Sequence, residues 1–229
     1  MEINKYIDHT NLKAYATKKD IEKLCDEAVQ HKFASVCVNP YYVSLANELL
    51  SRSNISVCTV IGFPLGQNTI SVKEFEAINA VQEGADEIDM VVNIAAIKDG
   101  NYDYVKEEIE TVRDSIDGKT LKVIIETCYL TKEEIIKMTE ICNETFVNFI
   151  KTSTGFGSDG AKVEDVQLMN EHKMDFLEIK ASGGIKTYED ACKFIEAGAT
   201  RLGTSNGVAI IEDASLKHYC DCNDCDESK

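Results

Sequence analysis

Short runs of β-branched and aromatic residues alternate with amphipathic stretches along most of this chain. Val, Ile and Phe fill the middles of eight such runs, without a strict alternation of apolar and polar positions. This pattern is typical of strands that are buried on both faces of a parallel sheet. We therefore predict eight strands, at Tyr6–Thr10, Phe33–Val38, Ile55–Ile61, Asp86–Val92, Leu121–Glu126, Phe146–Lys151, Phe176–Lys180 and Thr200–Thr204.

The amphipathic stretches between these runs predict helices, and several of them begin with a recognisable cap. Thr131 and Glu134 form a capping box, while Thr187 with Asp190 and, earlier in the chain, Thr17 give similar helix starts. Strands that alternate with helices indicate an α/β fold, and no glycine-rich dinucleotide turn supports an open doubly wound sheet. We therefore predict a single-domain (β/α)₈ TIM barrel.

The domain organisation follows from the composition along the chain, which shows no linker or low-complexity tract before about residue 215. We expect the barrel at 1–215 and an acidic, cysteine-containing and flexible tail at 216–229. The tail carries four candidate zinc ligands, His218, Cys220, Cys222 and Cys225. Because so short a segment seldom encloses a tetrahedral site, we expect no metal there.

Charge and cysteine content narrow the possible partners and the compartment. The chain has 40 acidic and 24 basic residues, and its net charge of −16 disfavours nucleic acid and anionic membranes as partners. The longest charge-free run, 53–72, contains polar residues and a proline, so we expect no membrane span. The nine cysteines have no disulfide-framework spacing, and the N-terminus lacks an apolar signal core. These features predict a cytoplasmic protein with reduced thiols.

Three ionisable residues interrupt the apolar strands near their C-terminal ends, where the active sites of barrel enzymes lie. Lys151 and Lys180 end consecutive strands, and Asp89 lies between Ile88 and Met90. Burial and a like-charged neighbour make a lysine amine neutral and nucleophilic, and a nearby carboxylate can move protons. A single lysine at a strand end is more often a surface residue, but two in consecutive strands favour Schiff-base chemistry.

Glycine-rich segments follow the last two predicted strands. Gly183 and Gly184 come after the seventh strand, while Gly203 and Ser205 come at the end of the eighth. Loops after strands seven and eight of a barrel commonly bind phosphate, because glycines let backbone amides approach the anion. A glycine pair alone often marks only a tight turn. At this position, however, the pattern predicts a phosphate site.

Together these motifs resemble the deoxyribose-phosphate aldolase family of class I aldolases. The resemblance extends from residue 7 to Asn206 and rests on the segments ADEIDMVVN, LKVIIET, FIKTSTGF, KASGGIKTYEDA, IGFPLG and RLGTS. It implies reversible cleavage of 2-deoxy-D-ribose 5-phosphate into acetaldehyde and D-glyceraldehyde 3-phosphate on a TIM barrel. It also implies that no cofactor or metal is needed, and that the chain forms a homo-oligomer, a dimer or a tetramer.

The family's functional residues match positions of this chain. Lys151 resembles the Schiff-base lysine, Lys180 the second lysine that activates it, and Asp89 the proton-relay carboxylate. Thr10 and Thr154 match residues that bind the sugar. The family's phosphate-contacting positions correspond to Gly155, Gly183, Gly184, Gly203 and Ser205, and Asn206 stands where many relatives have a second serine.

Besides Asn206, two residues depart from the family pattern, and the roles of two others stay open. Phe156 follows KTSTG where relatives often have lysine, and Tyr219 lies too far from the chain end to match a mobile terminal tyrosine of some relatives. Cys37 could face the substrate or be a buried structural thiol, and Glu126 could orient the site or cap a turn.

Two other functions stay open beside the aldolase that the motifs favour. One is a different lysine-dependent sugar-phosphate aldolase or a transaldolase-like barrel. The other is a catalytically silent barrel that binds a sugar phosphate, which would not require two buried lysines and Asp89.

Overall fold

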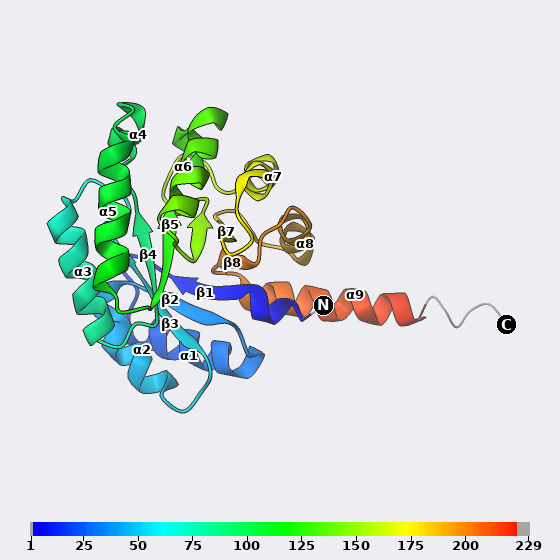
Figure 1. Cartoon of the computed structure of the whole chain (residues 1–229). Helices are drawn as coiled ribbons and strands as arrows, with labels where there is room; N and C mark the ends of the chain where they lie inside the picture. Colours follow the sequence, from blue (N-terminus) through cyan, green and yellow to red (C-terminus); the bar gives the residue numbers. More distant parts are fainter. Residues whose placement is uncertain (1, 224–229) are drawn as a thin grey trace.

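The computed structural model describes the backbone of residues 2–223 and the side chains of residues 2–216. Eight parallel strands close into a barrel in the order of the sequence, with β8 paired to β1 (Figure 1). The predicted fold is therefore confirmed. The strands are β1 Ile7–Asn11, β2 Ser35–Val38, β3 Ser56–Ile61, β4 Glu87–Val91, β5 Thr120–Ile124, β6 Phe149–Lys151, β7 Glu178–Ser182 and β8 Arg201–Thr204.

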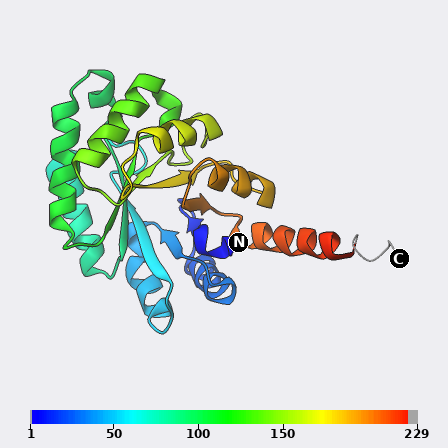
Figure 2. The same cartoon turned by 45° about the vertical axis from the view of Figure 1, so that its right-hand side comes forward.

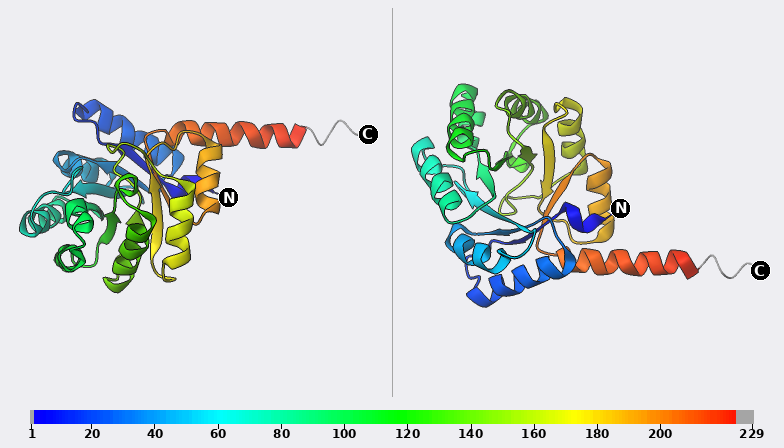
Figure 3. Two further views of the ribbon diagram at one scale, coloured as in Figure 1. Left: turned by 90° about the horizontal axis from the view of Figure 1, so that it is seen from above. Right: turned by 60° about the horizontal axis from the view of Figure 1, so that its bottom comes forward.

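Helices surround the barrel and cover its outer face, as the right-hand view of Figure 3 shows. They are α1 Lys18–His31, α2 Val43–Leu50, α3 Ile70–Gln82, α4 Ile94–Lys98, α5 Tyr102–Ser115, α6 Lys132–Glu144, α7 Val163–His172, α8 Tyr188–Glu196 and α9 Gly207–Asn223, with short 3₁₀ helices η1 Ile3–Tyr6, η2 Pro40–Tyr42 and η3 Thr127–Tyr129. Capping boxes start α1, α6 and α8 at the three threonines that the sequence indicated, Thr17, Thr131 and Thr187. No helix within the described residues is long and apolar enough to cross a membrane.

Some strand boundaries differ from the prediction, most clearly at β6. The predicted start, Phe146, has a left-handed backbone with φ 52° and a side chain that is 69% exposed, and it stacks on Phe176. The β6 strand therefore begins three residues later, at Phe149. Phe176 likewise precedes β7, which begins at Glu178. Aromatic residues raised the local strand signal at both positions, but these two rings lie outside the barrel wall.

The C-terminal helix α9 packs its first turns against the barrel, where Ile210 is fully buried, and its later part projects away from the barrel (Figure 2). It continues past residue 215, where the sequence suggested that the barrel domain ends. The side chains of His218, Tyr219, Cys220 and Cys222, and all of Cys225, lie outside the described residues. The division at residue 215 and the expected properties of the tail therefore stay predictions.

Candidate active site

The barrel interior brings together the three ionisable residues that the sequence singled out. Lys151 on β6 and Lys180 on β7 are direct partners in the strand register. Their Nζ atoms each lie 2.7 Å from the same oxygen, Oδ2 of Asp89 on β4. Asp89 and Lys180 are fully buried, whereas the side chain of Lys151 retains 4% of its exposure. One carboxylate oxygen therefore accepts hydrogen bonds from both amines.

The charged network is larger than the sequence indicated. Lys122 on β5 donates to Asp89 Oδ1 at 2.8 Å and lies 2.5 Å from Oε2 of Glu87. Asp8 on β1 lies 2.5 Å from Nζ of Lys180 and also pairs with Arg201 on β8. Many barrels fill their interior with aliphatic layers. In this barrel, part of that space holds acids and bases, which are costly to bury unless each is paired.

These contacts decide the charge of the buried groups. Burial opposes ionisation of Asp89, but Lys122, Lys151 and Lys180 outweigh it and hold the pKa of Asp89 well below its usual range. Burial also disfavours the charge of Lys180, yet Asp8 and Asp89 raise the pKa of Lys180 above the ordinary value. At neutral pH, Asp89 is therefore an anion and Lys180 a cation. Lys180 can hold a positive charge beside Lys151 but is itself a poor nucleophile.

A cavity of about 500 Å³ opens at the C-terminal end of the barrel, and Lys151 lines it. Lys122, Lys180 and Asp89 do not line this cavity, which we call the active-site cavity. A carbonyl compound that enters this cavity can reach the amine of Lys151. Lys122 and Lys180, in contrast, are fully buried in the barrel interior. Access therefore distinguishes Lys151 from Lys122 and Lys180.

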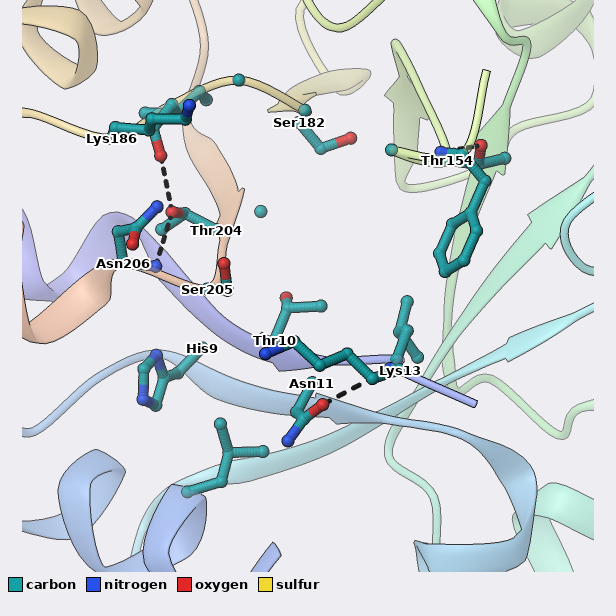
Figure 4. A pocket seen from close by; sticks show the side chains of 18 of the residues that line it. His9, Thr10, Asn11, Lys13, Thr154, Ser182, Lys186, Thr204, Ser205 and Asn206 are labelled. Carbon is teal, nitrogen blue, oxygen red and sulfur yellow. Dashed lines mark hydrogen bonds between the residues drawn. The ribbon is translucent and has the colours of Figure 1, made fainter. Parts of the chain in front are cut away.

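The residues predicted to bind substrate line the same cavity, around the open space that Figure 4 shows. They come from the ends of β1, β6, β7 and β8 and from the loops that follow. They are Thr10, Thr154, Gly155, Gly183, Gly184, Gly203, Ser205 and Asn206.

The loop after β6 is held by Glu126, which follows β5 with a left-handed backbone (φ 53°). The Glu126 carboxylate accepts the backbone N–H of Thr154 at 3.1 Å and also its hydroxyl. The Thr154 hydroxyl in turn accepts the N–H of Phe156 at 3.0 Å. Glu126 makes no side-chain capping bond to the following turn. It therefore orients the active-site loop, which settles the assignment that the sequence left open.

Two of the glycines are required by their surroundings. Gly183 has a left-handed backbone with φ 86°, and Gly160 packs directly against its carbonyl group. A Cβ atom at Gly203 would lie 3.1 Å from Cε of Lys180 and 2.9 Å from Cβ of Ser182. Gly203 therefore makes room for the buried lysine as well as lining the cavity.

The cavity also contains cationic side chains that the sequence reasoning missed. Lys186 follows the glycine pair of the segment KASGGIK and lines the cavity near Ser205 and Asn206 (Figure 4). Lys13 and Lys23 line it as well. Phe156, where relatives often have lysine, also lines it and packs edge-to-face against Phe63 with ring centroids 5.3 Å apart. Lys186 could have been found as a basic residue directly after the predicted phosphate loop.

Neither Cys37 nor the nearby acids form an attractive metal site. Cys37 is fully buried, packs with Leu12 and Val60, and does not line the active-site cavity, which fits a structural thiol. Its sulfur lies within 4.8 Å of possible ligand atoms of Cys58 and Asp89. The Asp89 carboxylate already accepts hydrogen bonds from three lysines, whose positive charges disfavour a metal cation at this position.

Comparisons with known proteins agree with this geometry. The model of the DeoC/LacD family aldolases matches residues 3–214. Deoxyribose-phosphate aldolase of Thermococcus gammatolerans is 59% identical, over 93% of this chain and 97% of that protein. Deoxyribose-phosphate aldolase of Finegoldia magna is 55% identical, over 93% of this chain and all of that protein.

Solved structures of aldolases also have this fold. An aldolase named QR15 superposes with a TM-score of 0.91 at 44% identity, over 95% of this chain and 98% of that one. A tetrameric deoxyribose phosphate aldolase from Aeropyrum pernix superposes with a TM-score of 0.86 at 28% identity, over 93% of this chain and 91% of that one.

Proposed function

Because the chain belongs to the DeoC/LacD family of aldolases, it is a carbon–carbon lyase, and we propose that its substrate is 2-deoxy-D-ribose 5-phosphate. The products are acetaldehyde and D-glyceraldehyde 3-phosphate, and the reaction is reversible. The observation that carries this proposal is the amine of Lys151, which lines the cavity and lies 2.7 Å from the Asp89 carboxylate.

The roles of the residues follow from their positions. Lys151 attacks the aldehyde carbon of the open-chain sugar and, with loss of water, forms an imine that accepts electrons. The bond between C2 and C3 then breaks as a proton leaves the hydroxyl group on C3, which releases glyceraldehyde 3-phosphate. Asp89 and Lys180 move protons to and from the remaining two-carbon enamine. Hydrolysis of the resulting imine releases acetaldehyde and regenerates Lys151.

We assign the substrate phosphate to the loops after β7 and β8. Gly183 and Gly184 supply a left-handed turn, and α9 begins directly after Ser205 and Asn206. Backbone amides and a helix N-terminus bind an anion without a formal charge. Lys186 adds a cation to this side of the cavity. Thr10 and Thr154 line the same cavity as Lys151, where they can bind sugar hydroxyls.

The proposed reaction is tested by incubating the enzyme with 2-deoxyribose 5-phosphate and quantifying both products. A ketose bisphosphate supplied in parallel tests the alternative of another lysine-dependent aldolase. Faster cleavage of the ketose bisphosphate would favour that alternative. Binding of both compounds without cleavage of either would favour a catalytically silent barrel.

We expect activity to be independent of added metal. The imine on Lys151 takes the place of a Lewis acid as the electron sink, so EDTA should leave kcat within about twofold of the untreated value. The measurement compares enzyme dialysed against EDTA with enzyme supplied with zinc. A chelator-sensitive reaction that zinc restores would contradict the Schiff-base mechanism.

Introducing lysine at position 156 should strengthen binding of the phosphorylated substrate. A cation on the cavity wall would add a charge-assisted contact to phosphate. Because the Phe156 side chain is 57% exposed, we expect a weak contact for a charge-assisted hydrogen bond. It should strengthen substrate binding by about 1 kcal/mol, which corresponds to a roughly fivefold lower KM. The measurement compares Phe156→Lys with wild type on deoxyribose 5-phosphate and on unphosphorylated deoxyribose, at low and moderate salt. Equal changes for both sugars would exclude a phosphate contact at this position.

We also propose a homo-oligomer, a dimer or a tetramer, and a cytoplasmic location. The tetramer described for the Aeropyrum pernix aldolase supports an oligomer in this family. An exposed, stacked aromatic pair, Phe146 and Phe176, offers apolar surface for such an interface. Sedimentation equilibrium of the full chain tests the oligomeric state.

A further inference from the structure

A second cavity adjoins the active-site cavity. It has a volume of about 530 Å³ and lies over the ends of β1, β2 and β3. Aromatic side chains dominate its walls, namely Tyr41, Tyr42, Phe63 and Phe156, together with Pro64. We call it the aromatic cavity.

The two cavities share part of their walls. Leu12, Lys13 and Phe156 line both of them. Phe156 is held between the cavities by its edge-to-face contact with Phe63, at an interplanar angle of 87°. The two cavities therefore adjoin at Leu12, Lys13 and Phe156, at the end of the active-site cavity that these residues line.

The chemistry of the aromatic cavity differs from that of the phosphate side. Of the described residues that line it, Lys13 alone carries a charge, and its ammonium lies 5.9 Å from the centre of the Tyr15 ring. The rim is fixed by Tyr42, whose hydroxyl donates to the carbonyl of Ala16 at 2.7 Å. Tyr41 packs edge-on against Tyr42, with ring centroids 4.9 Å apart. Such walls favour an aromatic or branched apolar group over a phosphate.

We propose that the aromatic cavity is an acceptor subsite, which holds the apolar tail of an unphosphorylated aldehyde during carbon–carbon bond formation. This inference rests on the proposed Schiff base at Lys151. The nucleophilic carbon of the acetaldehyde enamine attacks the carbonyl carbon of the acceptor, and a proton is transferred to the carbonyl oxygen. Water then hydrolyses the iminium group, which releases a 3-hydroxyaldehyde and frees Lys151.

The structure offers variants that alter this cavity alone. Ala14 and Tyr41 line the aromatic cavity but not the active-site cavity, and both are exposed. Ala14→Trp fills the aromatic cavity, and Tyr41→Ser removes one of its apolar walls. Tyr129→Ser is a matched control, because Tyr129 is an exposed tyrosine at the barrel mouth that lines neither cavity.

The experiment measures aldol addition of acetaldehyde to 3-phenylpropanal and to propanal, alongside cleavage of deoxyribose 5-phosphate. Burying the phenyl group should give wild type about a tenfold higher kcat/KM for 3-phenylpropanal than for propanal. Ala14→Trp should abolish this preference and Tyr41→Ser should reduce it about fivefold, while phosphorylated-sugar cleavage stays at the wild-type rate.

The outcomes separate this inference from the proposed function. No preference for the phenyl compound in wild type, or the same preference in Ala14→Trp, would overturn the subsite while sugar cleavage continued. Loss of the preference in Tyr129→Ser would also overturn it, because that residue touches neither cavity. Failure of wild type to cleave deoxyribose 5-phosphate would instead refute the proposed function.

Discussion

Replacement of Lys151 by alanine is expected to abolish both cleavage and covalent trapping of the substrate. Borohydride reduction in the presence of deoxyribose 5-phosphate should attach a two-carbon or sugar adduct to the wild-type peptide that contains Lys151. In Lys151→Ala no such adduct should form, and kcat/KM should fall on the order of 10³-fold or more, because the electron sink is lost. Mass mapping of the reduced protein checks the site of modification.

Lys151→Arg is the control for loss of structure. An arginine keeps a positive charge beside the Asp89 carboxylate, whose Oδ2 lies 2.7 Å from Nζ of Lys151, but it forms no imine. We therefore expect Lys151→Arg to be inactive while unfolding at a denaturant concentration close to that of wild type. An adduct on Lys122 or Lys180 in the wild-type enzyme would show that the access argument for Lys151 is wrong.

The buried position of Lys151, Lys180 and Asp89 could be predicted because each breaks an apolar run near the end of a strand. Lys151 and Lys180 stand next to isoleucine, and Asp89 stands between two apolar residues. The alternation of strands and helices along the chain predicted a parallel barrel, and the C-terminal ends of its strands placed these residues together. The strand register pairs Lys151 directly with Lys180, which places the two lysines side by side on the same face of the sheet.

The remaining members of the charged network were not predicted, for a physical reason. Asp8, Glu87 and Arg201 lie at or near the starts of strands, where polar residues are common. Asp8 and Arg201 meet only because the barrel closes between β1 and β8, although 193 positions separate them in sequence. Strands buried on both faces also show no alternation that would have marked Lys122 as facing inward.

The packing between loops could not be predicted from the sequence either. The contact of Phe156 with Phe63 joins the loops after β6 and β3, and it defines the wall between two cavities. Neither residue belongs to a periodic pattern, so only the three-dimensional arrangement relates them. In the sequence, Phe156 is notable only because it follows KTSTG where relatives often have lysine.

Replacement of Asp89 by asparagine should have the largest effect on stability. The Asp89 carboxylate accepts hydrogen bonds from three buried lysines, Lys122, Lys151 and Lys180. Removing its charge leaves these cations incompletely paired inside the barrel, so we expect Asp89→Asn to lower the free energy of unfolding by about 3–5 kcal/mol at pH 7. Urea denaturation measures this change.

The pH dependence of this loss of stability follows from the shifted pKa values of the buried groups. The folded-state pKa of Asp89 is lowered, so its stabilising contribution is present above the unfolded pKa, about 4, and is lost as the pH falls through the folded value. The folded-state pKa of Lys122 and of Lys180 is raised, so their contribution is lost at alkaline pH, as each folded pKa is passed. The difference between wild type and Asp89→Asn should therefore be largest between about pH 4 and pH 10.

Asp8→Asn separates the effect on stability from the effect on chemistry. Asp8 is also fully buried and pairs with Lys180 and Arg201, but it makes no described contact with Lys151. Both variants should therefore be destabilised, whereas kcat should fall about 10²- to 10⁴-fold in Asp89→Asn and at least tenfold less in Asp8→Asn. Equal losses of borohydride trapping at Lys151 in the two folded variants would mean that Asp89 supports the barrel interior without moving protons for Lys151.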